Sequence, residues 1–192
     1  METKMISVSA LAEQIELSNV LYLRPNAKTM FDNSINQYGT PLQGDIFVCD
    51  LSGIEDCSGS FVDEFIHNWI RLIRKTENTM FVITGMSEDV YYTVSSALSL
   101  RNKLSREAMS ILSLENGAYS LIGDKIEKNM REVFDFIIKN KKVTVRMVAE
   151  EFSLELNGAS NRLKKLYDSR LVMREEQSLE NGGKYEYFLP QI

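Results

Sequence analysis

Cysteine, histidine and proline are scarce in this chain of 192 residues, which contains two, one and three of them. Two cysteines and one histidine cannot supply the four ligands of a structural Cys/His zinc site. Three prolines do not make a Pro-rich linker. No apolar run reaches the roughly 18 residues of a membrane span, and the first residues lack the apolar core of a signal peptide. We therefore expect a soluble, cytoplasmic protein that holds no metal or cofactor and does not bind a membrane.

The distribution of charge is more informative than the net charge of −5. Residues 1–123 hold nine basic and fifteen acidic side chains, whereas residues 124–192 hold thirteen basic and twelve acidic ones. Within 139–174, nine basic side chains accompany four acidic ones, which gives this segment a local charge of +5. Such an excess on an acidic chain indicates a module that faces a polyanion. A solvated helix surface is the alternative, and charge by itself does not distinguish the two.

The first half of the sequence has the pattern of a layered α/β domain. Short apolar runs at 46–49 and 80–84 predict buried strands, and an amphipathic helix is predicted between them over 61–73. Ser87 is placed to cap a further helix. Strand, helix and strand in this order predict a right-handed parallel crossover. Two β-prone runs flank Asn-Gly at 116–117, the best short signal for a hairpin turn.

Two motifs in this half resemble the STAS family. They are Asp-Leu-Ser-Gly-Ile at 50–54 and Ser-Gly-Ser-Phe followed by Asp-Glu within 58–64, and the sequence looks closest to the STAS-like domains of unknown function. The resemblance covers 1–122 and implies an α/β fold there. In STAS anti-sigma-factor antagonists, a partner kinase phosphorylates a serine at the start of a helix. Carried over to this chain, that role falls on Ser58 or Ser60.

The two serines have a second interpretation. A phosphate at a helix N-terminus meets free N–H groups and the positive end of the helix dipole, but serine is also an ordinary N-cap residue. The sequence departs from the family pattern, since Gly59 separates the serines and Phe61 replaces a glycine, and this favours the N-cap interpretation. The candidate surface for modification or for an unidentified protein partner consists of Ser58, Ser60, Asp63 and Glu64.

The last third of the chain has a different order of elements. An amphipathic stripe over 126–138 predicts a helix, and a short helix face follows at 148–152. A tight turn leads to a second helix with Ala159, Leu163 and Leu166 inward. A strand from 171 and an aromatic strand over 184–189 then flank an Asn-Gly-Gly turn. Helix, short helix, turn, helix and hairpin is the order of a winged helix-turn-helix.

Three segments in this region resemble bacterial winged-helix regulators of the MarR or ArsR type. They read Met-Val-Ala-Glu-Glu-Phe-Ser-Leu at 147–154, Ala-Ser-Asn-Arg-Leu-Lys-Lys-Leu at 159–166 and Arg-Leu-Val-Met-Arg at 170–174. The resemblance implies a winged helix-turn-helix domain over 125–192. A glycine commonly precedes the Leu-Val pair in these proteins, and here Arg170 takes its place. A left-handed turn at that point would cost a residue other than glycine some stability.

In these regulators the second helix of the motif enters the major groove of double-stranded DNA. Asn pairs well with adenine, and Lys or Arg with guanine or phosphate. The resemblance therefore assigns base reading to the residues nearest the helix start, which are Asn157, Ser160 and Asn161. Phosphate contacts fall on Arg162, Lys164, Lys165 and a cluster formed by Lys139, Lys141 and Lys142. Contacts through the wing fall on Arg174 and Lys184.

Several acidic residues oppose this assignment. Glu175, Glu176 and Glu180 lie in the predicted wing, and Glu150 and Glu151 lie on the first helix of the motif, where each would repel phosphate if it faced DNA. The favoured hypothesis is a DNA-binding transcriptional regulator whose N-terminal domain senses a signal or forms a homodimer. The alternative is a partner-switching adaptor, similar to an anti-sigma-factor antagonist, whose winged helix binds protein.

An enzyme is the weakest hypothesis. His67 is the single imidazole, and Asp63 lies four residues before it on the predicted helix, so a catalytic dyad is conceivable. The favoured interpretation is a surface histidine within a ladder of charged residues that includes Arg71. We predict no catalytic residues.

Overall fold

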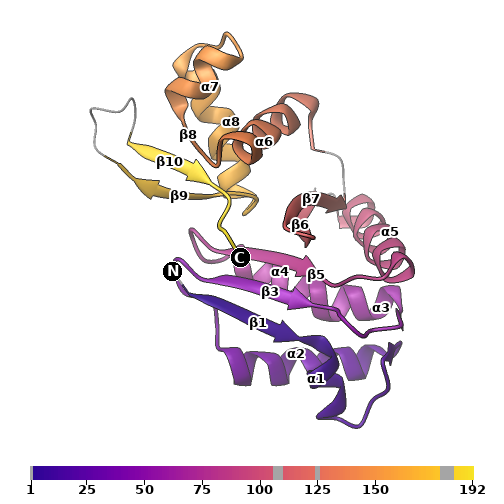
Figure 1. Ribbon diagram of the computed structural model, residues 1–192. Coiled ribbons are helices and arrows are strands. Elements are labelled where there is room, and N and C mark those ends of the chain that lie inside the picture. Colours follow the sequence, from indigo (N-terminus) through magenta and orange to yellow (C-terminus); the bar gives the residue numbers. More distant parts are fainter. Residues whose placement is uncertain (1, 106–109, 124–125, 178–183) are drawn as a thin grey trace. The chain divides into compact units, whose positions relative to one another are not determined.

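Figure 1 shows a computed structural model of the chain, which describes residues 2–105, 110–123, 126–177 and 184–192. The chain divides into two compact units, Met1–Lys125 and Ile126–Ile192. The fold is mixed α/β, with parallel and antiparallel strands and several helices. In the described ranges, no helix combines the length and the apolarity that crossing a bilayer requires.

A five-stranded sheet forms the centre of the first unit. In sheet order its strands are β1 (Thr3–Ser7), β3 (Ile46–Asp50), β5 (Met80–Thr84), β6 (Ser110–Glu115) and β7 (Ala118–Gly123). The first four strands run parallel, as the two apolar runs predicted for β3 and β5. β7 returns antiparallel to β6 through Asn116 and Gly117, whose φ angles of 52° and 75° are those of the predicted hairpin turn.

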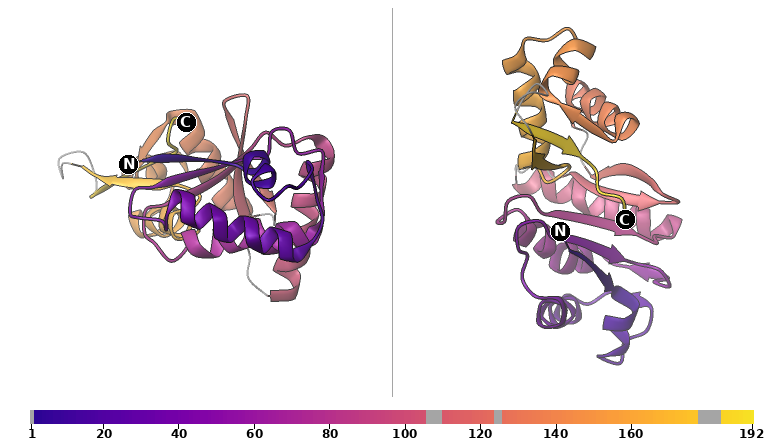
Figure 2. Two further views of the ribbon diagram at one scale, coloured as in Figure 1. Left: turned by 90° about the horizontal axis from the view of Figure 1, so that it is seen from below. Right: turned by 60° about the vertical axis from the view of Figure 1, so that its left-hand side comes forward.

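Helices cover this sheet on the side where the core of the unit lies. They are α1 (Val8–Glu13), α2 (Arg24–Tyr38), α3 (Gly59–Phe61), the π-helix η1 (Val62–Ile66), α4 (His67–Ile73) and α5 (Glu88–Ser105). Two short strands, β2 (Val20–Leu21) before α2 and β4 (Asp56–Cys57) before α3, pair in parallel. The predicted cap of α5 is confirmed, because the Val90 N–H donates to Ser87 Oγ at 3.2 Å. Figure 2 shows the same elements from two further sides.

Aromatic side chains fill the core of the first unit. The Trp69 ring lies 4.8 Å from that of Phe47 on β3 and 6.2 Å from that of Phe81 on β5, measured between ring centres. The Trp69 Nε1–H donates to the buried Ser34 hydroxyl at 3.0 Å, so the indole has its polar partner inside the core. This packing holds α4 against the middle of the sheet.

His67 corrects the prediction of a surface histidine, since only 2% of it is exposed. The predicted helix over 61–73 contains one π-helical stretch, η1, directly before His67. A π turn has an extra residue compared with an α turn, so it rotates everything that follows by about 100°. His67 therefore turns inward, and the Asp63 carboxylate pairs with two arginines.

The second unit combines three helices with a small antiparallel sheet of order β8-β10-β9. Its elements are α6 (Lys128–Asn140), β8 (Lys142–Thr144), α7 (Val145–Glu151), α8 (Leu156–Asp168), β9 (Met173–Glu176) and β10 (Tyr185–Phe188). The predicted helices and the two predicted strands are present. The predicted turn at 181–183 and Glu180 lie outside the described residues. Thr144 ends β8 and caps α7, because its Oγ1 accepts from the Met147 N–H at 3.2 Å.

Arg170 occupies the left-handed turn after α8, with a φ of 60°. Its guanidinium donates to the carbonyl oxygens of Tyr167 at 3.1 Å and Asp168 at 3.3 Å. The last carbonyls of a helix have no partner within the helix. The side chain of Arg170 thus supplies bonds at the helix end that a glycine would not.

Candidate functional sites

Helix α8 has two chemically different sides. Ala159, Leu163 and Leu166 are completely buried, and α7 packs against this helix. The apolar residues recur at intervals of three and four, which places them on one stripe of the helix. The opposite side is left to polar residues and to solvent.

The polar side of α8 brings together most of the residues predicted to bind DNA. Asn157, Asn161, Lys164 and Lys165 are exposed. The first three follow one another at i, i+4 and i+7, so they form a single ridge along the helix. Ser160 and Arg162 are half-buried and flank the ridge. This surface, which we call the α8 ridge, presents two amides and two ammonium groups.

Lys164 is paired with an acid on its own helix. Its Nζ lies 2.5 Å from Asp168 Oδ2, and both side chains are largely exposed. An exposed pair of this kind contributes only about 0.3–0.5 kcal/mol. The pair is therefore weak enough to open when a phosphate oxygen competes for the lysine.

The two residues predicted for the wing differ in their surroundings. The Arg174 guanidinium lies between two rings, 4.0 Å from the centre of Tyr167 and 4.1 Å from that of Tyr185. It is half-buried, so this stack fixes its direction. Lys184 is exposed and pairs with Glu176 at 3.3 Å.

Glu175 and Glu176, two of the acids predicted to oppose DNA on the wing, are paired with lysines. Glu176 pairs with Lys184, and Glu175 pairs with Lys142 from β8, on the far side of β10. The hydrogen bond that the Lys142 ammonium donates to Glu175 raises the pKa of Lys142 above its usual value. These contacts compensate the two carboxylates locally, which lowers the repulsion that they exert on a nearby anion.

A second polar site lies in the first unit, where four segments meet around Asp63. Its carboxylate pairs with Arg24 from α2 at 2.8 Å and with Arg101 from α5 at 2.7 Å. Arg24 also pairs with Glu64 at 2.8 Å, and these two acids raise the pKa of its guanidinium. A cavity of about 260 Å³ opens beside this cluster. It is lined by Arg24, Gly59, Ser60, Asp63, Ala97, Leu100, Arg101 and Leu104.

The two candidate serines both donate a hydrogen bond to the same backbone carbonyl. The hydroxyls of Ser58 and Ser60 lie 2.6 Å and 2.7 Å from the carbonyl oxygen of Tyr22 and 2.8 Å from each other. The predicted N-cap is confirmed for Ser58, because its Oγ accepts from the Phe61 N–H at 3.2 Å. Ser60 lines the cavity and Ser58 does not.

Both cysteines are free and buried. Burial raises the pKa of the Cys57 thiol to about 12 and that of Cys49 still further. Neither thiol is therefore ionised near neutral pH, as a nucleophilic cysteine needs to be. Among the residues that the structure describes, no group of three His, Cys, Asp or Glu side chains could hold a metal ion.

Models of known protein families do not match this chain, and neither does any curated protein. What bears on its function is therefore the geometry of its two sites. The sequence pattern singled out Asp63 but not the two arginines that it meets, Arg24 and Arg101. These residues are 38 or more positions apart, and no local pattern in the sequence links them.

Proposed function

We propose that this chain is a DNA-binding transcriptional regulator. In this proposal residues 125–192 form a winged helix-turn-helix domain, and residues 1–122 form a STAS-like domain that senses a signal or joins two copies. The observation that carries the proposal is the division of α8 into a fully buried apolar stripe and an exposed ridge of amides and ammonium groups. A helix of this kind after a short helix and a tight turn suits insertion into a major groove.

Each residue of the α8 ridge has a role that follows from its chemistry. The side-chain amides of Asn157 and Asn161 can each donate to N7 of adenine and accept from its N6 amino group, which makes them the base-reading residues. Lys164 and Lys165 contact phosphates and set the position of the helix on the duplex. Ser160 and Arg162 add hydrogen bonds at the edges of the contact.

The wing contributes through the strands β9 and β10. Lys184 is an exposed cation that can exchange its contact with Glu176 for a phosphate oxygen. Arg174 acts through its stack between Tyr167 and Tyr185, which ties the wing to the end of α8. Lys142 holds Glu175 beside it, so that this carboxylate does not face the phosphates alone.

The proposal is tested with a variant in which Lys164→Glu and Lys165→Glu are combined. We expect its affinity for a duplex of random sequence to fall at least about tenfold in 100 mM salt, because two phosphate contacts become repulsive. The slope of log K against log salt should shrink by about two. Fluorescence anisotropy over a series of salt concentrations measures both quantities.

The matched control carries Lys28→Glu and Lys75→Glu, which change the same charge at exposed positions of the first unit. Its affinity and its salt slope should stay close to those of the unchanged chain. The proposal fails if the unchanged chain has no salt-dependent affinity for duplex DNA, or if both double variants lose affinity equally.

A second candidate function is supported by the cavity beside Asp63. Two arginines and a serine line it together with the exposed side chains of Leu100 and Leu104, a mixture that suits contact with another protein. Under this alternative the chain is a partner-switching adaptor, and its winged helix binds protein. The Lys164→Glu, Lys165→Glu variant then leaves regulation unchanged in cells, whereas Ser60→Glu abolishes it.

A further inference from the structure

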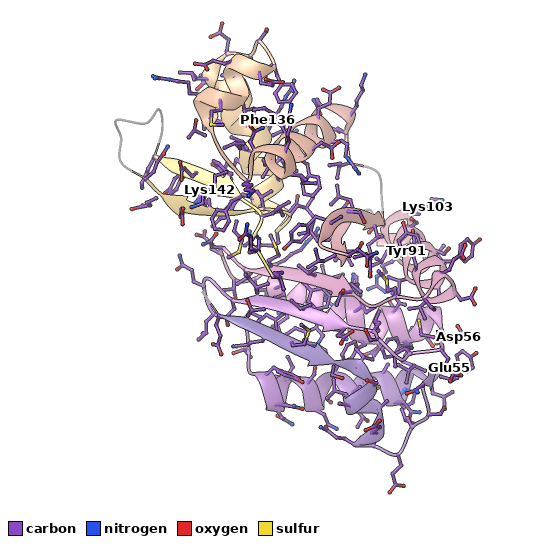
Figure 3. The ribbon with its side chains drawn as sticks, in the orientation of Figure 1. Glu55, Asp56, Tyr91, Lys103, Phe136 and Lys142 are labelled. Carbon is purple, nitrogen blue, oxygen red and sulfur yellow. The ribbon has the colours of Figure 1, made fainter. Side chains whose placement is uncertain are left out.

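Helix α5 carries more exposed large hydrophobic side chains than any other helix in the described part of the chain. Four of the eleven large hydrophobic side chains that are exposed in the described part of the chain lie on it: Tyr91, Tyr92, Leu100 and Leu104. The inner side holds the fully buried Val90 and Val94, which face the core. Figure 3 labels Tyr91 and Lys103 on this helix. Tyr92 and Leu100 lie on the opposite, outer side of the helix, where exposed apolar side chains mark a contact surface.

The residues on this side are spaced symmetrically about Ser96, with an acid toward one end and a base toward the other. At 100° per residue, the exposed residues Asp89, Tyr92, Ser96, Leu100 and Lys103 all lie within about 40° of the direction of Ser96. Tyr92 and Leu100 lie four residues on either side of Ser96, and Asp89 and Lys103 lie seven residues on either side. We call these five residues the α5 stripe.

A second copy of the chain fits the α5 stripe when the two helices run antiparallel. With a two-fold axis at Ser96, Asp89 lies opposite the partner subunit's Lys103, and Tyr92 lies opposite the partner subunit's Leu100. Each contact then occurs twice, as an isologous interface requires. The first turn of α5 is acidic and its last turn is basic, so a parallel arrangement would bring like charges together.

We propose that this protein self-associates as a two-fold dimer through the α5 stripe. The small side chain of Ser96 at the axis lets the helix axes approach to the usual 8–10 Å. The inference rests on the part of the proposed function in which residues 1–122 join two copies, and it does not require DNA. A dimer would also supply two α8 ridges for two half-sites. Leu100 borders the cavity beside Asp63, so a second copy on the stripe competes with a partner at that cavity.

Charge reversal in the full chain tests the proposal. Asp89→Lys and Lys103→Asp each turn two attractive pairs into two repulsive ones, and we expect either change to weaken dimerisation about tenfold or more. The double variant, which carries both changes, restores the pairs with exchanged signs and should dimerise as the unchanged chain does. Sedimentation equilibrium from micromolar to about 200 micromolar chain measures the dissociation constants.

The matched control is Glu88→Lys, which makes the same change in the same turn of α5 but lies about 80° from the direction of Ser96. It should leave the dimer unchanged, while circular dichroism verifies that all four variants are folded. A monomer at every concentration overturns the proposal. So does a dimer that responds equally to Glu88→Lys and Asp89→Lys, or one that the double variant does not restore.

A cross-link gives an independent measure of the register. Ser96→Cys places two thiols at the two-fold axis, and oxidised glutathione should convert the pair to a disulfide-linked dimer. Cys49 and Cys57 are buried and do not compete for the oxidant. Thr29→Cys, at an exposed position on α2, is the control and should remain a monomer on a non-reducing gel. Equal cross-linking at both positions contradicts the proposed axis.

Discussion

Removing the charge of Asp168 should strengthen DNA binding. This acid lies at the end of α8 and holds Lys164, one of the two lysines to which we assign phosphate contacts. In Asp168→Asn the side chain keeps its size and loses its negative charge. Lys164 is then released, and the α8 ridge gains one unit of positive charge. A gain of affinity from a single substitution is an outcome that damage to the fold cannot imitate.

The size of this gain follows from two contributions. The exposed pair between Lys164 and Asp168 costs about 0.3–0.5 kcal/mol to open. A carboxylate about 7 Å from a phosphate is repelled by about 0.6 kcal/mol in water, and salt near 0.1 M reduces this to about 0.3 kcal/mol. Together they predict binding that is about threefold tighter.

The assay is a titration of labelled duplex DNA with Asp168→Asn, with Asp135→Asn as the control. Asp135 forms the same type of exposed i, i+4 pair with Arg131 on α6, at 2.9 Å, but lies outside the α8 ridge. The control should not change the affinity by more than the precision of the titration. Binding that weakens in Asp168→Asn, or that tightens equally in both variants, would refute the assignment of Lys164 to a phosphate.

Two further predictions concern stability. Arg170→Ala should lower the free energy of unfolding of the second unit by about 1 kcal/mol, because alanine keeps the left-handed φ and loses two hydrogen bonds. Arg170→Gly loses the same bonds but should be close to neutral, because glycine adopts a left-handed φ without steric cost. Urea unfolding of the two variants measures the difference, and equal values would contradict this account. Because burial raises the pKa of Cys57 from 9.0 to about 12, the stability that its neutral thiol contributes is present below pH 9 and is lost as the pH rises toward 12. Cys57→Ala should therefore flatten the decline of the melting temperature over that interval, and an unchanged decline would show that this thiol is not responsible.

Local patterns predicted the elements well. The strands β3 and β5 were predicted because their residues are apolar without interruption, which is typical of the strands of a parallel sheet. The hairpin between β6 and β7 follows from Asn116 and Gly117, which accept positive φ more readily than other residues. The buried stripe of α8 follows from the spacing of Ala159, Leu163 and Leu166.

Patterns that assume a uniform helix failed at His67. Its predicted surface position rests on 3.6 residues per turn, and the π-helix η1 breaks that period one residue earlier. β8 is another limit of local reasoning, because a strand of three residues has too little sequence for a period to appear. Its identity depends on pairing with β10, more than 40 residues later.

The sequence by itself determined most of the helices, strands and turns, and which side of α8 is apolar. Those properties depend on backbone preferences and on burial, which act over a few neighbouring residues. Only the tertiary structure decided that Asp63 joins Arg24 to Arg101, that Arg174 lies between Tyr167 and Tyr185, and that His67 is buried. The physical reason is that charges and rings far apart in the chain meet through packing, which leaves no periodic trace in the sequence.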